Sequence, residues 1–252
     1  MEEILVVENI VKTFSGLKAI DNVSLKIGKG GVYGIIGPNG SGKSTLFNVI
    51  SGVLKPDSGR IYFMGERIDG LPPHEIYNKG IARSFQIPTL FLKMPVIENM
   101  LLPPKRQKGE ILYHAPFQRS WESQELNLAE KAKNTLHDLK LINVYGNKAS
   151  EVSGGQMKLL EVGRTMMAEP KLILLDEPTA GIAPNLAEEI FKIIKSLRDK
   201  YGLTFMIIEH RYDILFKHAE YIFLLNEGKL IAEGQPSKLL DSTILAQVYL
   251  GD

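Results

Sequence analysis

The sequence contains no cysteine among its 252 residues. Without thiols the chain cannot form a disulfide, a thiolate metal site or a cysteine nucleophile, which fits a reducing compartment without requiring one. No apolar run approaches the roughly 18 residues that a membrane-spanning helix needs, and the acidic start MEEILVVE lacks the pattern of a secretion signal. We therefore expect a cytoplasmic protein unless partners hold it at a membrane.

An excess of charge of either sign is also missing. The chain has 30 basic and 29 acidic side chains, a net charge of +1. It therefore lacks the basic field through which proteins bind nucleic acid without regard to sequence, and nucleic acid is not an expected partner. Hydrophobic residues make up 44% and charged residues 23%, values close to those of folded globular proteins.

Short apolar or alternating runs separated by glycine-rich turns predict strands in the first third of the chain, at residues 4–11, 23–27, 32–36 and 60–64. After Ser44 the apolar residues follow helical spacing. The last third alternates again, with a helix opening at Pro184 and strands predicted at residues 172–175, 204–208 and 221–225. Because long helical crossovers join such strands, we expect a parallel sheet.

The pattern changes in the middle of the chain. Residues 88–116 contain five prolines and a basic patch, Lys105, Arg106 and Lys108, and we interpret them as an irregular insertion. The patch could touch lipid head groups or a partner, although most such runs are solvated loops. A helix predicted up to Lys140 follows. We expect a mainly helical subdomain at residues 88–159, inserted into a core made of residues 1–87 and 160–252.

The segment GPNGSGKS lies between a predicted strand and a predicted helix and matches the phosphate-binding loop. Its glycines let backbone N–H groups converge on phosphate oxygens, its lysine reaches the outer phosphates, and its last serine can ligate magnesium. A chance glycine-rich turn would rarely fall in this context. The expected nucleotide-binding residues are Gly37, Pro38, Asn39, Gly40, Ser41, Gly42, Lys43, Ser44 and Thr45.

Two acidic residues, Asp176 and Glu177, end the apolar run LILLDE. Ligands bind at this edge of parallel sheets, although a buried strand can also end in a solvated or helix-capping acid. Beside a phosphate loop, Asp176 is suited to hold the magnesium shell, and Glu177 to orient and deprotonate the attacking water. Adjacent residues point to different sides, so two roles are expected.

The segment Ser153, Gly154, Gly155 and Gln156 precedes another predicted helix. Ser-x-x-Gln alone is a capping box, which carries no function. The glycine pair also leaves the N-terminus of the helix unshielded, so its N–H groups and the Ser153 hydroxyl could bind a phosphate presented by another molecule.

Taken together, the phosphate loop, SGGQ and LLDEP, in this order and with a helical insertion between the first two, resemble the ATP-binding subunits of ABC transporters over residues 4–240. The resemblance implies an α/β fold, with a P-loop NTPase core, an N-terminal antiparallel β subdomain and an inserted helical subdomain. It also implies ATP and Mg²⁺ as cofactors. Two chains would sandwich ATP, each signature segment facing the partner's phosphate loop.

The resemblance assigns three further residues. Phe14 matches the aromatic that stacks on adenine, Gln86 the glutamine that senses magnesium and the membrane subunits, and His210 the histidine that contacts the γ-phosphate. In isolation a lone aromatic is usually core and a lone histidine is usually structural. The resemblance thus makes Lys43, Gln86, Glu177 and His210 catalytic, and Ser44, Gln86 and Asp176 the metal-binding set.

Two positions depart from the family pattern. Val152 replaces a leucine ahead of the signature serine, where we expect little effect. Ala183 stands where an aspartate commonly links the two subunits, so communication between the two ATP sites is in question.

The segments GIARSFQ, IEHR and VYLGD are similar to those of branched-chain amino acid uptake ATPases, with the lipopolysaccharide-export ATPase as the alternative. The resemblance implies as partners a second ATPase subunit, permease subunits and, indirectly, a solute-binding protein, at the cytoplasmic face of the membrane. A non-transport ABC protein usually needs tandem ATPase domains or a coiled-coil insert. A regulator that does not turn over ATP should have lost a catalytic residue. Both are disfavoured.

Overall fold

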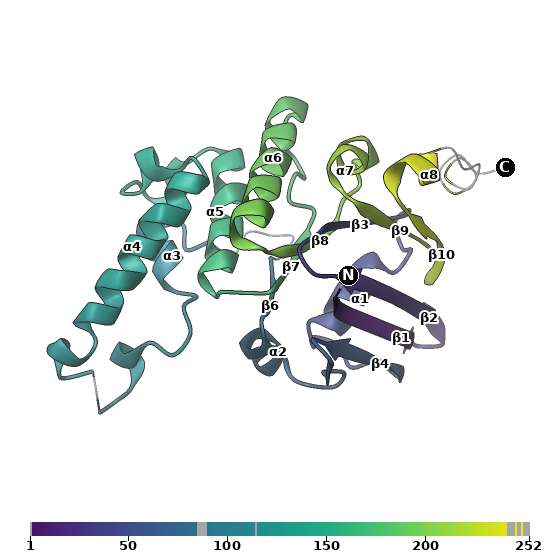
Figure 1. Ribbon diagram of the computed structural model, residues 1–252, viewed down its shortest axis with the longest axis horizontal. Helices are drawn as coiled ribbons and strands as arrows, with labels where there is room; N and C mark the ends of the chain where they lie inside the picture. The colour runs from purple at the N-terminus through teal and green to yellow at the C-terminus, as the bar shows by residue number, and fades with distance from the viewer. Residues whose placement is uncertain (1, 85–89, 114, 241–244, 246–247, 249–252) are drawn as a thin grey trace. The chain divides into compact units, whose positions relative to one another are not determined.

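The computed structural model describes residues 2–84, 90–113, 115–240, 245 and 248, and its chain divides into two units (Figure 1). The first unit consists of Met1–Arg83 and Lys171–Asp252, and the second of Ser84–Pro170. The first unit carries both sheets, and the second is helical. Among the described residues, no helix combines the length and the apolar character that crossing a bilayer requires.

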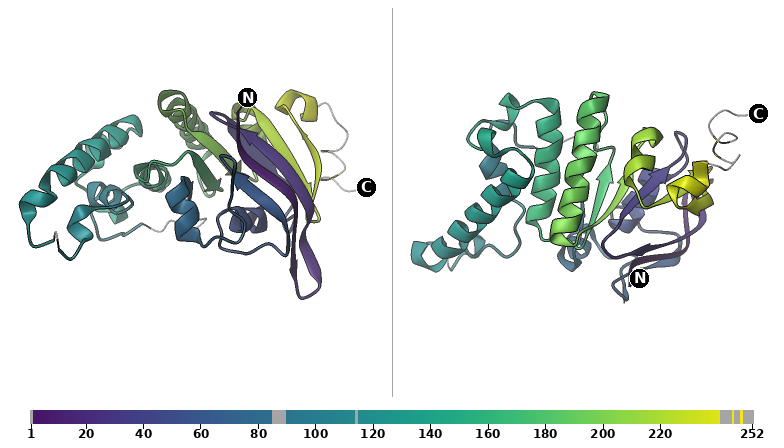
Figure 2. Two further views of the ribbon diagram at one scale, coloured as in Figure 1. Left: turned by 60° about the horizontal axis from the view of Figure 1, so that its bottom comes forward. Right: turned by 45° about the horizontal axis from the view of Figure 1, so that its top comes forward.

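An antiparallel sheet of four strands, in the order β2-β1-β4-β5, opens the first unit. Its strands are β1 (Glu3–Phe14), β2 (Leu17–Gly28), β4 (Ser58–Phe63) and β5 (Glu66–Arg67). Ser15 and Gly16, with φ of 46° and 89°, form the tight turn between β1 and β2. The pairing of β1 with β4 ends at Val11 and Ser58, so the β1–β2 hairpin extends past β4 (Figure 2).

A second sheet of six strands has the order β10-β9-β3-β8-β7-β6. Five strands pair in parallel: β6 (Ile81–Arg83), β7 (Leu172–Asp176), β8 (Thr204–Ile208), β3 (Val32–Ile36) and β9 (Tyr221–Asn226). The edge strand β10 (Lys229–Gly234) is antiparallel to β9. The parallel prediction is thus confirmed for five strands. All residues of β3, β7 and β8 are buried, as expected where a parallel sheet is covered on both faces.

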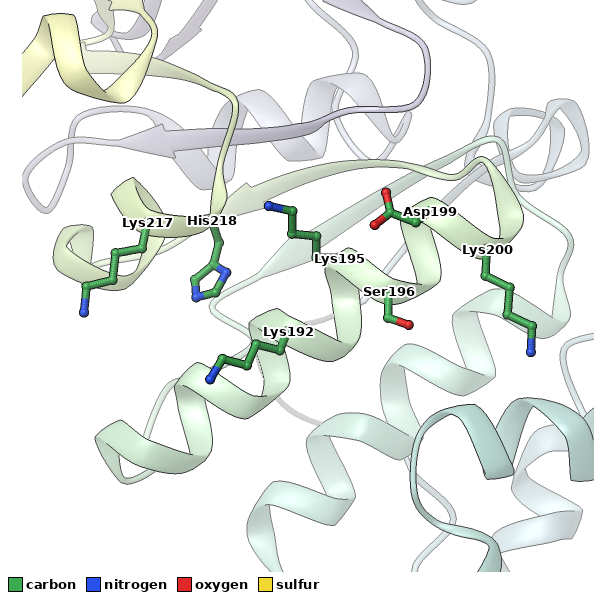
Figure 3. A pocket seen from close by; sticks show the side chains of 7 residues that line it. All are labelled: Lys192, Lys195, Ser196, Asp199, Lys200, Lys217 and His218. Carbon is green, nitrogen blue, oxygen red and sulfur yellow. The ribbon is translucent and has the colours of Figure 1, made fainter.

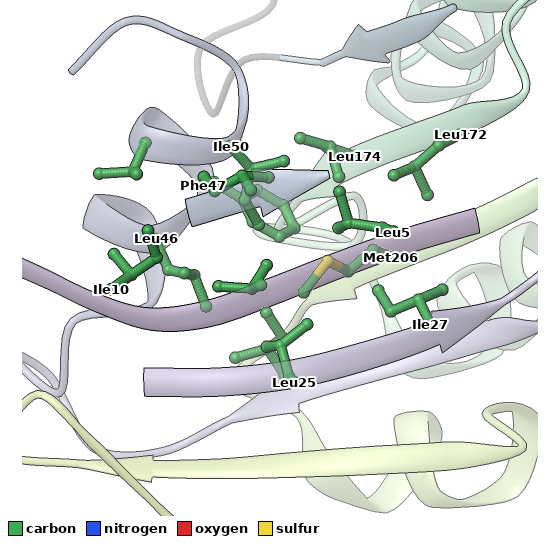
Figure 4. Packing of buried hydrophobic residues seen from close by; sticks show 14 of the residues in the cluster. Leu5, Ile10, Leu25, Ile27, Leu46, Phe47, Ile50, Leu172, Leu174 and Met206 are labelled. Carbon is green, nitrogen blue, oxygen red and sulfur yellow. The ribbon is translucent and has the colours of Figure 1, made fainter. Parts of the chain in front are cut away.

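Helix α1 (Lys43–Ile50) lies in the main core of this unit, among side chains of both sheets (Figure 4). Leu46, Phe47 and Ile50 are fully buried there with Leu5, Ile27 and other apolar residues. Burial of each such side chain contributes about 1.5 to 3 kcal/mol relative to exposure. The core therefore fixes α1, and with it the loop that precedes α1.

The first unit also contains the helices α2 (Pro73–Lys79), α6 (Pro184–Tyr201), α7 (Tyr212–His218) and α8 (Pro236–Leu240). Helix α7 packs on β3 at Gly34, where an added Cβ would lie 2.6 Å from Leu215 Cδ2. The helix predicted to open at Pro184 does so, with proline at its first position.

The second unit packs three helices together: α3 (Val96–Leu101), α4 (Glu122–Asp138) and α5 (Gly154–Met167). The interpretation of residues 88–116 as an irregular insertion is wrong for Val96–Leu101, which form α3. Asn99 of α3 is fully buried, and its amide binds the backbone of Phe91, Met94 and Pro95. A buried polar residue in a helix of six residues breaks the apolar periodicity on which recognition of helices depends.

Candidate nucleotide-binding site

The phosphate-loop segment joins the end of β3 to the start of α1. Gly37 and Gly42 have φ of 150° and 99°, and a Cβ at these positions would lie 2.1 Å from Leu225 O and 2.5 Å from Ala19 O. Only glycine fits such a backbone. Helix α1 begins with neither a side-chain cap nor an acidic residue in its first turn, so its positive end is available to an anion.

Lys43 is folded over its own loop. Its Nζ donates hydrogen bonds to Gly37 O and Pro38 O, each at 2.8 Å. Burial lowers the pKa of Lys43, while the nearby carboxylates of Glu177 and Asp176 act in the opposite direction. The two acidic residues therefore act electrostatically on the lysine of the phosphate loop, as their place at the end of β7 predicts.

Asp176 and Glu177 have different partners. Asp176 Oδ2 lies 3.0 Å from Arg83 Nη2, in a pair whose side chains are 4% and 9% exposed. The same guanidinium donates to Asn48 Oδ1 at 2.6 Å and to Ser51 Oγ at 3.2 Å. Arg83 thus joins the end of β7 to the end of α1. This role of Arg83 was not predicted from the sequence; its only local signal is a charged residue directly after the apolar residues Ile81 and Ala82 of β6.

Glu177 Oε1 lies 2.8 Å from His210 Nε2. Glu177 has a φ of 50°, a conformation that is uncommon for a residue with a side chain. Its backbone N–H donates to Ile208 O at 2.9 Å, which joins the residue after β7 to the end of β8. The structure therefore brings together the expected base and the expected γ-phosphate contact as a direct pair.

The loop between β7 and α6 is bound by the two chain neighbours of His210, Glu209 and Arg211. Glu209, which is 2% exposed, accepts hydrogen bonds from the N–H and the hydroxyl of Thr179. Arg211 Nη1 donates to Ile182 O at 3.2 Å. These contacts were not predicted from the sequence. The signal for Glu209 was the one used for Asp176, an acidic residue directly after a buried strand.

Phe14 ends β1 at the tip of the hairpin and is 43% exposed, with Lys12 Nζ 5.5 Å from its ring centroid. It is therefore not a core residue. The second strand of this hairpin, β2, lies beside the phosphate loop, because a Cβ added at Gly42 would lie 2.5 Å from the backbone oxygen of Ala19. Its stacking on adenine stays a prediction.

The signature segment lies in the second unit, where Ser153 is the N-cap of α5. Ser153 Oγ accepts from Gln156 N at 3.3 Å, and Gln156 Oε1 accepts from Ser153 N at 2.9 Å. The capping box is therefore formed. Ser153 and Gly154 are also exposed, so a phosphate from another chain could reach them. Binding of such a phosphate stays a prediction. Gln86 lies outside the described residues.

Comparison with known proteins agrees with this geometry. Residues 20–180 match the ABC transporter family, and the chain belongs to that family. It is 45% identical to the probable branched-chain amino acid transport ATP-binding protein LivG of Methanocaldococcus jannaschii, over 99% of this chain and 98% of that protein. It is 34% identical to the high-affinity branched-chain amino acid transport ATP-binding protein BraF of Pseudomonas aeruginosa, over 99% and 98%.

Solved structures give the same result. The ADP conformation of MJ1267, an ATP-binding cassette of an ABC transporter, covers all of both chains with a TM-score of 0.87 and 45% identity. The cassette MJ0796, a dimer in a post-hydrolysis state bound to ADP and Pi, has a TM-score of 0.76 and 26% identity over 92% of this chain and 98% of that chain. The predictions of the family, the fold class and an ABC-type ATPase are confirmed.

Proposed function

We propose that the site at β3, β7 and β8 hydrolyses ATP to drive import of branched-chain amino acids. The observation that carries the reaction is the pair Glu177 Oε1 and His210 Nε2, 2.8 Å apart, at the edge of the sheet that also holds the phosphate loop. Both residues follow buried parallel strands, and ligands of such sheets bind at that edge.

Lys43 and the N-terminus of α1 would hold the phosphates. In the described structure Lys43 Nζ is bound by two carbonyl oxygens of its own loop, and phosphate oxygens would replace them as acceptors. The N–H groups of residues 40–45 add positive potential without a side-chain charge. This arrangement favours a nucleotide triphosphate over a neutral ligand.

The residues present also suit Mg²⁺. The Ser44 hydroxyl and the Asp176 carboxylate offer hard oxygen donors, and the ion commonly binds to one or two carboxylates together with phosphate oxygens. The effect of Asp176 on the pKa of Lys43 indicates that this carboxylate is close to the loop. When bound, the ion neutralises charge on the phosphates. Gln86 is proposed as a further ligand from the resemblance alone.

Glu177 is proposed as the base. Water attacks the γ-phosphorus, its proton passes to the Glu177 carboxylate, and the bond from the γ-phosphorus to the bridging oxygen breaks, with that oxygen leaving on ADP. His210 holds Oε1 in place and contacts the γ-phosphate. General-base assistance of this kind accounts for about 10² to 10⁴ in rate.

The second ATPase chain is proposed because each chain supplies only part of a site. Ser153, Gly154, Gly155 and Gln156 would contact the ATP bound to the partner subunit. ATP would thus hold two chains together and hydrolysis would release them, a cycle that permease subunits at the cytoplasmic face of the membrane can use. A solute-binding protein would deliver the amino acid to those permeases.

The substrate class rests on full-length relatives. Proteins named for branched-chain amino acid transport match 99% or more of the chain at 31% to 45% identity. Isolating the tagged chain from its native membrane and identifying bound proteins by mass spectrometry tests the assignment. We expect a second, similar ATPase chain and amino acid permeases, and leucine uptake that fails when the gene is deleted. A single ATPase species with export-type permeases would favour the lipopolysaccharide-export alternative instead.

A further inference from the structure

Residues 102–113 and 115–121, between α3 and α4, form a loop that exposes large apolar side chains. Leu112 is 80%, Tyr113 83% and Phe117 67% exposed. Soluble surfaces carry single exposed apolar residues routinely, but a group of them within one segment indicates a contact surface. In Figure 1 the segment lies at the N-terminal end of α4.

The loop is held in place by hydrogen bonds rather than by its apolar side chains. Gln124 of α4 accepts from Lys108 N at 2.8 Å and donates to Arg106 O at 3.2 Å. Trp121 Nε1 donates to Ala115 O at 3.2 Å, and Gln107 Nε2 donates to Leu101 O at 3.0 Å. The fold therefore positions this loop while leaving Leu112, Tyr113 and Phe117 at the surface.

The same loop is basic. It contains Lys105, Arg106, Lys108 and Arg119 against one acidic residue, Glu110, and all but Lys105 of these cations are exposed. Glu122 and Glu125 follow in the first turn of α4, where the positive end of the helix offsets their charge. Apolar and aromatic side chains beside exposed arginine and lysine are the combination that binds the head-group region of an anionic bilayer.

We infer that residues 102–113 and 115–121 form a membrane-contact loop that binds the surface of bilayers containing anionic lipid. Leu112, Tyr113 and Phe117 enter the head-group region, and Arg106, Lys108 and Arg119 lie against the lipid phosphates. A lipid surface fits better than an acidic protein, because the apolar side chains are long and exposed on a projecting loop rather than arranged around a groove. The phosphate loop, Asp176, Glu177 and His210 belong to the other unit, and none of the loop residues named here is among the residues proposed to bind ATP.

Another basic surface offers a matched control. Lys192 and Lys195 of α6 and Lys217 of α7 line a groove of about 720 Å³ around His218 (Figure 3). These three lysines are exposed, and the residues that line the groove are all polar or charged. Removing its charges changes the net charge of the chain as much as removing those of the loop.

The test is co-sedimentation of the full chain with vesicles of phosphatidylcholine, with and without phosphatidylglycerol. We expect binding only to the anionic vesicles, weakened by salt. Since each cation near an anionic surface contributes about 1 kcal/mol, Arg106→Gln, Lys108→Gln and Arg119→Gln together should lower the partition coefficient roughly 100-fold. Leu112→Ser, Tyr113→Ser and Phe117→Ser together should also lower it, with ATP binding and circular dichroism unchanged.

Replacing Lys192, Lys195 and Lys217 by glutamine should change the partition coefficient less than about threefold, because these lysines lie outside the loop. An equal loss in both charge variants would mean that any cation serves, and the proposal would be wrong. It would also be wrong if wild-type protein ignored the anionic vesicles. If the serine variant converted a dimer to a monomer without vesicles, the loop would bind a second copy instead.

Discussion

Glu209 Oε1 accepts two hydrogen bonds from Thr179, at 2.9 Å from its backbone nitrogen and 2.7 Å from its hydroxyl. The contact joins the end of β8 to the loop after β7, with His210 next in the chain. Burial raises the pKa of Glu209, while the hydrogen bonds from Thr179 act in the opposite direction. Because this buried acid has a raised pKa, the free energy of unfolding should depend on pH in a way that substitutions of Glu209 can test.

Because the pKa of Glu209 is raised on folding, its contribution to stability is present below the unfolded pKa, about 4.3, and is lost as pH rises through the folded pKa. Glu209→Gln keeps the Oε1 acceptor without the charge. We expect it to unfold in urea at the same or higher concentration than wild type at pH 8, with the gain shrinking toward pH 4.5. A gain that grows on acidification would contradict the raised pKa.

Glu209→Ala separates the hydrogen bonds from the charge. It leaves the N–H and hydroxyl of buried Thr179 without this acceptor, which should cost about 1 to 3 kcal/mol of unfolding free energy at pH 5, and less at pH 8, where the raised pKa already weakens the wild type. We expect ATP hydrolysis to fall with it, because the loop next to Glu177 loses its attachment. Wild-type stability in this variant would show that Glu209 does not hold the loop.

Glu177→Gln tests the proposed base. The variant should bind ATP as wild type does, hydrolyse it about 10² to 10⁴ times more slowly, and accumulate an ATP-bound dimer in size-exclusion chromatography. The matched control is Glu188→Gln, because Glu188 Oε1 also pairs with a histidine, His218 Nε2, at 3.0 Å. That pair lies on α6 and α7, so its loss should leave hydrolysis unchanged. Rapid turnover by Glu177→Gln would exclude Glu177 as the base.

Local patterns were sufficient to predict much of the sheet. The buried runs at residues 32–36 and 204–208 coincide with β3 and β8, because apolar runs of only five residues, rich in β-branched and aromatic side chains and bounded by glycine or polar residues, favour buried strands. Helix α6 was predicted at its first residue, since proline is favoured there. In contrast, α3 is too short to show periodicity, and its buried Asn99 reads as a surface residue.

The partners of the site residues could not be predicted, because they depend on strand order. Asp176 and Arg83 are 93 residues apart, yet β6 and β7 are neighbours. No local sequence pattern predicts that these two strands are adjacent. The same holds for Thr179 and Glu209, which are brought together because β7 and β8 pair. The motifs therefore identified the residues of the site, while the contacts that hold them required the fold.

Phe14→Ala tests adenine stacking. Base–aromatic stacking is worth about 1 to 3 kcal/mol, so the Kd for ATP should rise roughly 5- to 150-fold. The melting temperature of the nucleotide-free protein should barely change, because Phe14 is 43% exposed. Leu17→Ala is the control, since Leu17 is the cross-strand partner of Phe14 and is 72% exposed. Equal loss of affinity in both variants would indicate a general effect of the hairpin.

Arg83→Ala tests the ion pair between β6 and β7. Removing one partner of a buried pair typically costs about 3 to 5 kcal/mol, because the other charge remains in a poorly solvated place. We expect a loss of this size in urea unfolding, and weaker ATP binding because α1 and Asp176 lose a shared contact. Lys26→Ala removes a lysine from its pair with Glu3, in which both side chains are exposed, and should have a far smaller effect. Equal effects would show that the Arg83 pair is energetically unimportant.

Ala183 is the N-cap of α6, and no side chain caps the helix there. Aspartate and serine both accept hydrogen bonds from the free N–H groups of the first turn, so Ala183→Asp and Ala183→Ser should each raise the free energy of unfolding by about 1 kcal/mol. Only the aspartate can also provide the link between subunits that the family resemblance implies at this position. A change in the Hill coefficient of ATP hydrolysis in Ala183→Asp, but not in Ala183→Ser, would separate that link from capping. If both variants unfold at the wild-type urea concentration, the hydroxyl and carboxylate do not reach the helix, and the alanine costs this fold nothing.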